Sequence, residues 1–202
     1  KCDQREHSDM RDETFVTLIV DKSGSMESIQ LDVIGGINKF LDDQSKSEKP
    51  VKVSLVQFDD RYEVNYVDVP ASEAKRLNTR TYSPRGMTAL NYSVARTINE
   101  LGERLSAMNE EDRPSRVVVV IYSDGLENNS QYHTPFYSQA DVKRMIQHQS
   151  DVYNWQFLFL GADLSAKVGE DMGIKSSFRV AKQNTVANLE AVSRSVCAYS
   201  AG

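Results

Sequence analysis

Three short runs of almost continuously apolar residues constrain the fold of this chain more than any other feature. They lie at residues 15–20 (FVTLIV), 117–121 (VVVVI) and 155–160 (WQFLFL). A strand with one face in water alternates apolar and polar residues, whereas a strand covered on both faces can be apolar throughout. The runs are therefore predicted to be central strands of a sheet that has helices on both faces.

Two helical stripes separate the first two strands, because apolar residues there recur every three or four positions. One stripe comprises Met26, Ile29, Val33, Ile37, Phe40 and Leu41, and the other Leu90, Val94, Ile98, Leu101, Leu105 and Met108. The first stripe contains Gly35 and Gly36, each of which costs up to ~1 kcal/mol in a helix interior relative to alanine. We expect close packing of this helix against the sheet to compensate for the two glycines.

A hairpin is predicted between the stripes. Residues 51–58 and 62–69 are strand-like, and only Asp59, Asp60 and Arg61 connect them, which indicates an antiparallel pair whose second strand lies at an edge. We interpret Asp59 and Asp60 as a solvated turn. Towards the C-terminus, the pattern predicts helices near 138–149, 163–172 and 185–199 and a short strand near 177–180.

Strands thus alternate with helices, which predicts an α/β fold with three layers and a doubly wound, mostly parallel sheet. The length of 202 residues fits one domain, at 14–202, after a polar lead-in at 1–13. The net charge of −5 argues against a nucleic-acid partner, and no apolar run approaches the ~20 residues of a membrane-spanning helix. We expect a monomer in isolation.

Cys2 and Cys197 are the two cysteines of the chain. A bridge between them would indicate an extracellular or periplasmic protein. The alternative, in which Cys197 is a small core residue next to Val196, agrees with a cytoplasmic location. No signal peptide is visible, although the chain opens at Lys1 without a methionine, which is consistent with the removal of a leader.

Polar side chains with oxygen donors gather in three loops. Asp21, Ser23 and Ser25 follow the first strand, Asp124 follows the strand at 117–121, and Thr88 precedes the second helical stripe. In open α/β sheets such loops meet at the carboxyl ends of the strands, where ligands bind. A set of oxygen ligands without thiol or imidazole selects a hard cation, which predicts Mg²⁺, with Mn²⁺ or Ca²⁺ as alternatives.

The same residues also have structural interpretations. Ser23, Ser25 or Thr88 could cap the helix that follows it, and Asp124 with Gly125 could form an ordinary turn. Their combination in three converging loops favours the cation. Because hydroxyl ligands carry no charge, the cation would stay positive and attract a carboxylate from a partner.

The motifs DKSGS (21–25), GMTAL (86–90) and SDGLEN (123–128) resemble the metal-ion-dependent adhesion site of von Willebrand factor A domains. The segments VQFDD, YSPRGMTALNYSV and YNWQFLFLGA resemble small single-domain A-type proteins of bacteria and phages. The resemblance implies a Rossmann-like sheet of six strands in the order 3-2-1-4-5-6, with one antiparallel edge strand. It also implies direct coordination by Ser23, Ser25 and Thr88, with Asp21 and Asp124 acting mostly through water. Met87 and Ser123 depart from the usual glycine and threonine without removing a ligand.

A rim around the cation is predicted to contact the partner. It comprises Met26, Met87, Leu126, Tyr132, His133, Phe136 and Tyr137, most of them in the polar and aromatic segment 126–137. The alternative is that this segment is a loop folded on itself.

The sequence therefore favours a cation-dependent protein-binding module, not an enzyme, whose partner presents a glutamate or an aspartate. One alternative is an Mg²⁺-dependent phosphatase or phosphotransferase, although Ser23 occupies the position where such enzymes generally carry a second carboxylate. Another is a scaffold whose metal site is empty. The resemblance also suggests a movement of the last helix coupled to the site, which nothing in residues 185–199 demonstrates.

Overall fold

The central sheet orders its strands β3-β2-β1-β4-β5-β6 in the computed structural model, which describes residues 12–162, 166–180 and 193–199. Within these residues, the six strands are β1 (Thr14–Asp21), β2 (Val51–Phe58), β3 (Tyr62–Pro70), β4 (Arg116–Ser123), β5 (Gln156–Ala162) and β6 (Ser176–Val180). All neighbouring pairs are parallel except the β2–β3 hairpin. The predicted strand order and the antiparallel edge strand are confirmed.

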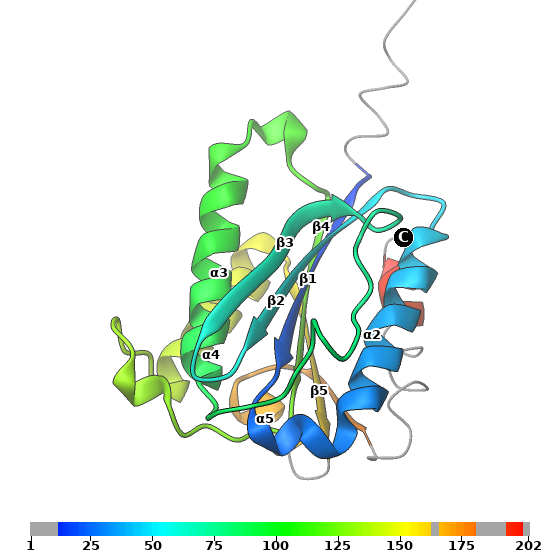
Figure 1. Cartoon of the computed structure of the whole chain (residues 1–202). Coiled ribbons are helices and arrows are strands. Elements are labelled where there is room, and N and C mark those ends of the chain that lie inside the picture. The colour runs from blue at the N-terminus through cyan, green and yellow to red at the C-terminus, as the bar shows by residue number, and fades with distance from the viewer. Residues whose placement is uncertain (1–11, 163–165, 181–192, 200–202) are drawn as a thin grey trace, which may run out of the picture.

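Helices cover both faces of this sheet (Figure 1). The helix α2 (Gln30–Ser45) lies on one face, and α3 (Leu90–Ala107) and α4 (Gln139–Tyr153) lie on the other. The remaining elements are α5 (Ala166–Asp171) and the short 3₁₀ helices η1 (Gly24–Ile29), η2 (Glu110–Asp112) and η3 (Ser130–Tyr132). None of the described helices is long and apolar enough to cross a membrane.

The strand β1 shows why the run at residues 15–20 is apolar throughout: all eight residues of the strand are buried. Val16, Leu18 and Val20 contribute to the core beneath α2, whereas Phe15 and Ile19 contribute to the core beneath α3 and α4. Alternate residues point to opposite faces of a strand, so each face needs its own apolar set. This is why the run has no polar alternation.

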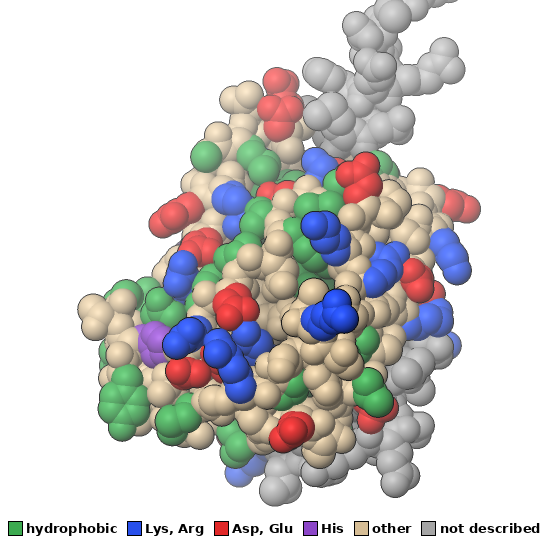
Figure 2. All heavy atoms as spheres, in the orientation of Figure 1, with side chains coloured by type: hydrophobic (Ala, Val, Ile, Leu, Met, Phe, Trp, Pro, Cys, Tyr) green, Lys and Arg blue, Asp and Glu red, His purple; other side chains and the backbone are tan. Residues whose placement is uncertain are grey.

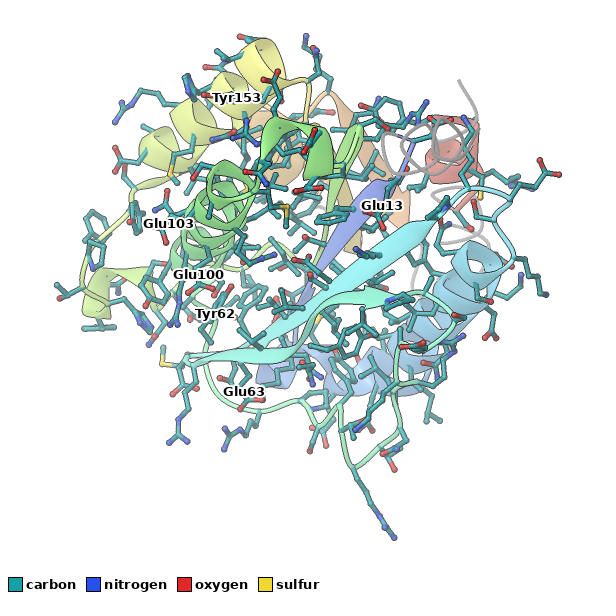
Figure 3. The ribbon with its side chains drawn as sticks, turned by 90° about the horizontal axis from the view of Figure 1, so that it is seen from above. Glu13, Tyr62, Glu63, Glu100, Glu103 and Tyr153 are labelled. Carbon is teal, nitrogen blue, oxygen red and sulfur yellow. The ribbon has the colours of Figure 1, made fainter. Side chains whose placement is uncertain are left out.

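The first residue of the edge strand β3, Tyr62, connects this strand to the helix α3. Figure 3 shows Tyr62 and Glu100 close together, and the Tyr62 hydroxyl lies 2.9 Å from the Thr97 hydroxyl and 3.4 Å from Glu100 Oε2. The guanidinium of Arg96 stacks over the Tyr62 ring at 4.2 Å. The hairpin therefore has a fixed position over α3, next to the edge where the strands end.

The last predicted helix is observed only in part. Residues 193–199 are helical, and 185–192 lie outside the described residues. Gln44 of α2 donates a hydrogen bond to the Ser193 hydroxyl at 3.0 Å, and Val196 joins the core beneath α2. Cys197 is half-buried; because Cys2 lies outside the described residues, the bridge between the two stays a prediction.

The expectation of close packing at both glycines of α2 is wrong for Gly35. Gly36 is buried, but Gly35 is exposed, and a Cβ atom added there would meet no atom within 4 Å. Nothing in the surroundings of Gly35 therefore requires a glycine, and the residue only costs the helix conformational entropy.

We expect Gly35→Ala to stabilise the fold by about 1 kcal/mol, because alanine is the better helix former at a site with room for its methyl group. Chemical denaturation measures the change. Gly173→Ala is the matched control: Gly173 has a φ of +80° and its Cβ would lie 3.2 Å from Lys143 Cγ, so the same substitution should destabilise there. A loss of stability in Gly35→Ala would contradict the account.

Candidate cation site

The predicted cation ligands meet at the carboxyl ends of two neighbouring strands. Asp21 is the last residue of β1, and Asp124 directly follows β4, which pairs with β1 along its length. The Ser25 hydroxyl donates a hydrogen bond to Asp124 Oδ2 and lies 3.2 Å from the Ser23 hydroxyl. Four of the five predicted ligands therefore share one edge of the sheet.

Asp21 is the most buried of the ligands, with no exposed surface. Its Oδ1 accepts a hydrogen bond from the Ser23 amide at 2.7 Å, and its Oδ2 accepts one from the Ser123 hydroxyl at 2.7 Å. The pKa of this carboxyl is raised to about 6: burial is the main cause and the nearby charge of Asp124 adds to it, while the hydrogen bonds from Ser23 and Ser123 act in the opposite direction. A buried carboxylate beside a second one is costly without a compensating positive charge.

Thr88 comes from a long irregular segment, residues 71–89, whose end runs along the same edge (Figure 1). Two backbone hydrogen bonds hold this end against the first ligand loop: Arg85 N donates to Lys22 O at 2.8 Å, and Gly24 N donates to Gly86 O at 3.1 Å. Thr88 is 1 % exposed. These bonds place the segment that carries Thr88 beside the loop of Ser23 and Ser25.

The capping interpretation of the hydroxyl residues is wrong in this structure. Ser23 stands at the N-terminus of η1 and Ala89 at that of α3, and neither helix has a side-chain cap. Ser25 lies inside η1. Asp124 does form a turn, because its Oδ1 accepts from Leu126 N at 3.2 Å, but its other oxygen bonds Ser25. The arrangement leaves the serine hydroxyls beside the carboxylates.

The donor set fits a hard cation that takes neutral oxygen ligands. Among the described residues, no three His, Cys, Asp or Glu side chains lie together in a way that would hold a metal ion. The site has two carboxylates and depends on hydroxyls for its remaining ligands, which suits Mg²⁺ or Mn²⁺ better than a soft metal. That these five side chains bind a cation stays a prediction.

A cluster of charges flanks the site on the side of the hairpin, where Figure 2 shows basic and acidic side chains side by side. Lys22, only 6 % exposed, pairs with Glu63 at 2.6 Å, and Arg85 pairs with Asp59 at 3.2 Å. Asp59 is fully buried and its carbonyl accepts from Ala89 N at 2.9 Å. The interpretation of Asp59 as a solvated turn residue is therefore wrong: it attaches the Thr88 segment to the hairpin.

Four residues of the predicted rim are exposed to solvent, and their contact with a partner stays a prediction. Met87, Leu126, Tyr132 and Phe136 are exposed by 47, 51, 74 and 58 %. Met26 is wrong as a rim residue, because it is fully buried in the core beneath α2.

The aromatic residues of the segment 126–137 divide between the two interpretations. His133 stacks on Tyr92 at 4.2 Å between ring centroids, and Tyr137 packs against the core beneath α3 and α4. Part of the segment thus packs against the protein, whereas Tyr132 and Phe136 are exposed to solvent.

No family model matches this chain, and no curated protein matches it in sequence. Solved structures do match in fold. A von Willebrand factor type A protein from Catenulispora acidiphila shares 15 % identity at a TM-score of 0.58, over 90 % of this chain and 42 % of its own.

Two further matches carry metal ions. Manganese-loaded TRAP protein of Plasmodium vivax shares 15 % identity at a TM-score of 0.57, over 88 % of this chain and 72 % of its own. Proximal thread matrix protein 1 of the mussel byssus, with a zinc-occupied metal-ion-dependent adhesion site motif, shares 14 % identity at a TM-score of 0.60, over 94 % and 47 %. This chain therefore spans less than half the length of two of these three proteins, and at these identities the likeness concerns the fold. The chain has the fold of von Willebrand factor type A domains.

Proposed function

We propose that this chain is a protein-binding module that grips its partner through a divalent cation, Mg²⁺ in the first place, held by Asp21, Ser23, Ser25, Thr88 and Asp124. The observation that carries the proposal is the buried Asp21 carboxylate at the same edge as Asp124 and two serine hydroxyls. A positive ion would remove the cost of burying that charge. The manganese and zinc of the two similar structures support a divalent cation in this fold.

The residues also define what the cation can do. The three hydroxyls are neutral ligands, and with Asp21 and Asp124 acting mostly through water the direct ligands would leave the charge of the cation uncompensated. Mg²⁺ takes about six oxygen ligands in octahedral geometry, so a position would remain for an oxygen from outside. A bound cation would supply electrostatic attraction for one more anionic oxygen from outside. A glutamate or aspartate side chain of a partner protein satisfies that need.

The exposed rim gives the partner a second kind of contact. Met87, Leu126, Tyr132 and Phe136 are among the large apolar side chains that the described residues leave exposed, and Figure 2 shows hydrophobic surface over the segment that contains η3. Aromatic and methionine side chains are enriched in protein interfaces. The proposed partner therefore presents an acidic residue next to apolar ones.

No observation favours the phosphatase or phosphotransferase alternative. Ser23 stands at the position where such enzymes carry a second carboxylate, and its hydroxyl lies 3.2 Å from that of Ser25. A panel of phosphatase substrates tests the alternative, and turnover that depends on Asp21 would revive it.

We expect the native partner to be captured from the host in MgCl₂ and lost in EDTA. Asp21→Ala and Thr88→Ala should each weaken capture at least about tenfold, because each removes a ligand of the cation. Asp151→Ala is the matched control. Asp151 is an exposed carboxylate near the amino-terminal end of β5, whereas the proposed cation site lies at the carboxyl ends of the strands. Capture that is unchanged in excess EDTA would indicate a scaffold that works without a cation.

We also expect the stabilisation by Mg²⁺ to depend on pH. Because the pKa of Asp21 is raised to about 6, the metal-free fold binds a proton more tightly than the unfolded chain, and its stability falls as the pH rises from about 4 to about 6. A cation favours the ionised form instead. The rise in Tm on adding MgCl₂ should thus be larger at about pH 7.5 than at about pH 5, and Asp21→Asn should lose this difference. Thermal unfolding with MgCl₂ or EDTA measures it; equal shifts at both pH values in the unsubstituted protein would contradict the assignment.

A further inference from the structure

Thr88 differs from the other proposed ligands in what fixes its position. Asp21 ends a strand and Asp124 directly follows one, so the sheet places both of them. Thr88 lies in an irregular segment, one residue before Ala89, which is the N-cap residue of α3. Its peptide groups must therefore be held by tertiary contacts if its hydroxyl is to meet a cation with defined geometry.

Those contacts come from the loop that carries Asp124. The Asn128 side chain accepts a hydrogen bond from Thr88 N at 2.8 Å, and the Asn128 amide donates one back to Thr88 O at 3.0 Å. The amide of Asn129 donates to the same carbonyl at 3.0 Å. The N–H and the C=O of Thr88 are thus both hydrogen-bonded to the segment after Asp124. One of these three hydrogen bonds uses a side chain, that of Asn128.

The same segment also binds the start of α3. Glu127 Oε2 accepts from Asn91 N at 2.7 Å, and the Ser130 hydroxyl accepts from Tyr92 N at 2.9 Å. Glu127 in turn accepts from the Ser130 amide and hydroxyl at 2.8 and 2.7 Å. Because α3 has no side-chain cap of its own, these bonds satisfy amides of its first turn. Thr88 and the first turn of α3 are therefore both attached to the loop of Asp124.

We propose that Asn128 is the positioning residue of Thr88, and that through it the Asp124 loop sets the place of the Thr88 hydroxyl at the cation. The inference rests on the proposed function, since it assumes that Thr88 is a ligand. Within the described residues, the amide oxygen of Asn128 accepts its hydrogen bond from Thr88 N. Its proposed effect on the cation therefore passes through Thr88.

The test measures the affinity of the metal-free protein for MnCl₂ alone by isothermal titration calorimetry, in wild type, Asn128→Ala, Thr88→Ala and the double variant. Loss of a residue that orients a metal ligand typically weakens binding by 10-fold or more, so we expect about a tenfold loss in Asn128→Ala. In the Thr88→Ala background the same substitution should change affinity by less than about twofold, because the group through which it acts is gone.

Asn129→Ala is the matched control. Asn129 also bonds Thr88, but only through its backbone, and its side chain faces His133 and Met87. Its removal should leave the affinity for Mn²⁺ unchanged, and thermal unfolding in EDTA reports whether each variant is folded. Should Asn128→Ala fail to fold, Asn128→Ser takes its place with the same expectation.

The results of this experiment distinguish a failure of the positioning role from a failure of the proposed cation site. Unchanged Mn²⁺ affinity in Asn128→Ala, or an equal loss with and without Thr88, overturns the positioning role while the cation site stands. Wild-type protein that binds no Mn²⁺ overturns both. A loss that is confined to the background with Thr88 and absent in Asn129→Ala supports the proposal.

Discussion

The burial of the Asp21 carboxylate is the physical constraint on which the proposed cation site depends. Asp21 ends the most buried strand of the sheet and has no exposed surface, so its charge has no water to stabilise it. Hydrogen bonds from Ser23 and Ser123 compensate in part, but the pKa of the group is still raised. An ionised carboxylate in such a place is stabilised by a positive charge beside it, and the cation that we propose at the neighbouring hydroxyls would supply that charge.

The rest of the site is assembled by tertiary contacts. The hairpin, through Asp59, and the Asp124 loop, through Asn128, hold opposite sides of the segment that carries Thr88. Neither contact belongs to a strand or a helix. The position of the segment that carries Thr88 therefore depends on residues that are not proposed ligands, and substitutions at these residues would alter the site without removing a ligand.

Periodicity in the sequence predicted the sheet and the helices that cover it, because burial on two faces leaves a direct signature in strands such as β1. It also predicted that Asp21, Ser23, Ser25 and Asp124 share an edge, since parallel strands end together. Met26 was assigned both to the first apolar stripe and, from its place beside the motif, to the rim. The structure buries it in the core, as periodicity predicted and the motif did not.

Asp59 shows the same limit of sequence reasoning. Two adjacent aspartates in a short turn suggest exposure to solvent. The side chains of Lys22 and Arg85, which are distant in sequence, lie near the Asp59 carboxylate and stabilise its charge where it is buried. Asn128 gave no signal either, because an asparagine in a polar loop has many structural uses. The one sign in the sequence is Ala89 before α3, which cannot cap the helix and leaves the amides of its first turn to be satisfied from elsewhere.

The most direct test of the account is a crystal structure of the chain grown with MnCl₂ and measured for anomalous scattering. The account predicts a manganese peak bounded by the oxygens of Asp21, Ser23, Ser25, Thr88 and Asp124, with at least one position of the ion open to solvent or to a carboxylate of a neighbouring molecule. Well-ordered side chains at these five positions with no peak between them, at a manganese concentration far above the millimolar range, would contradict it.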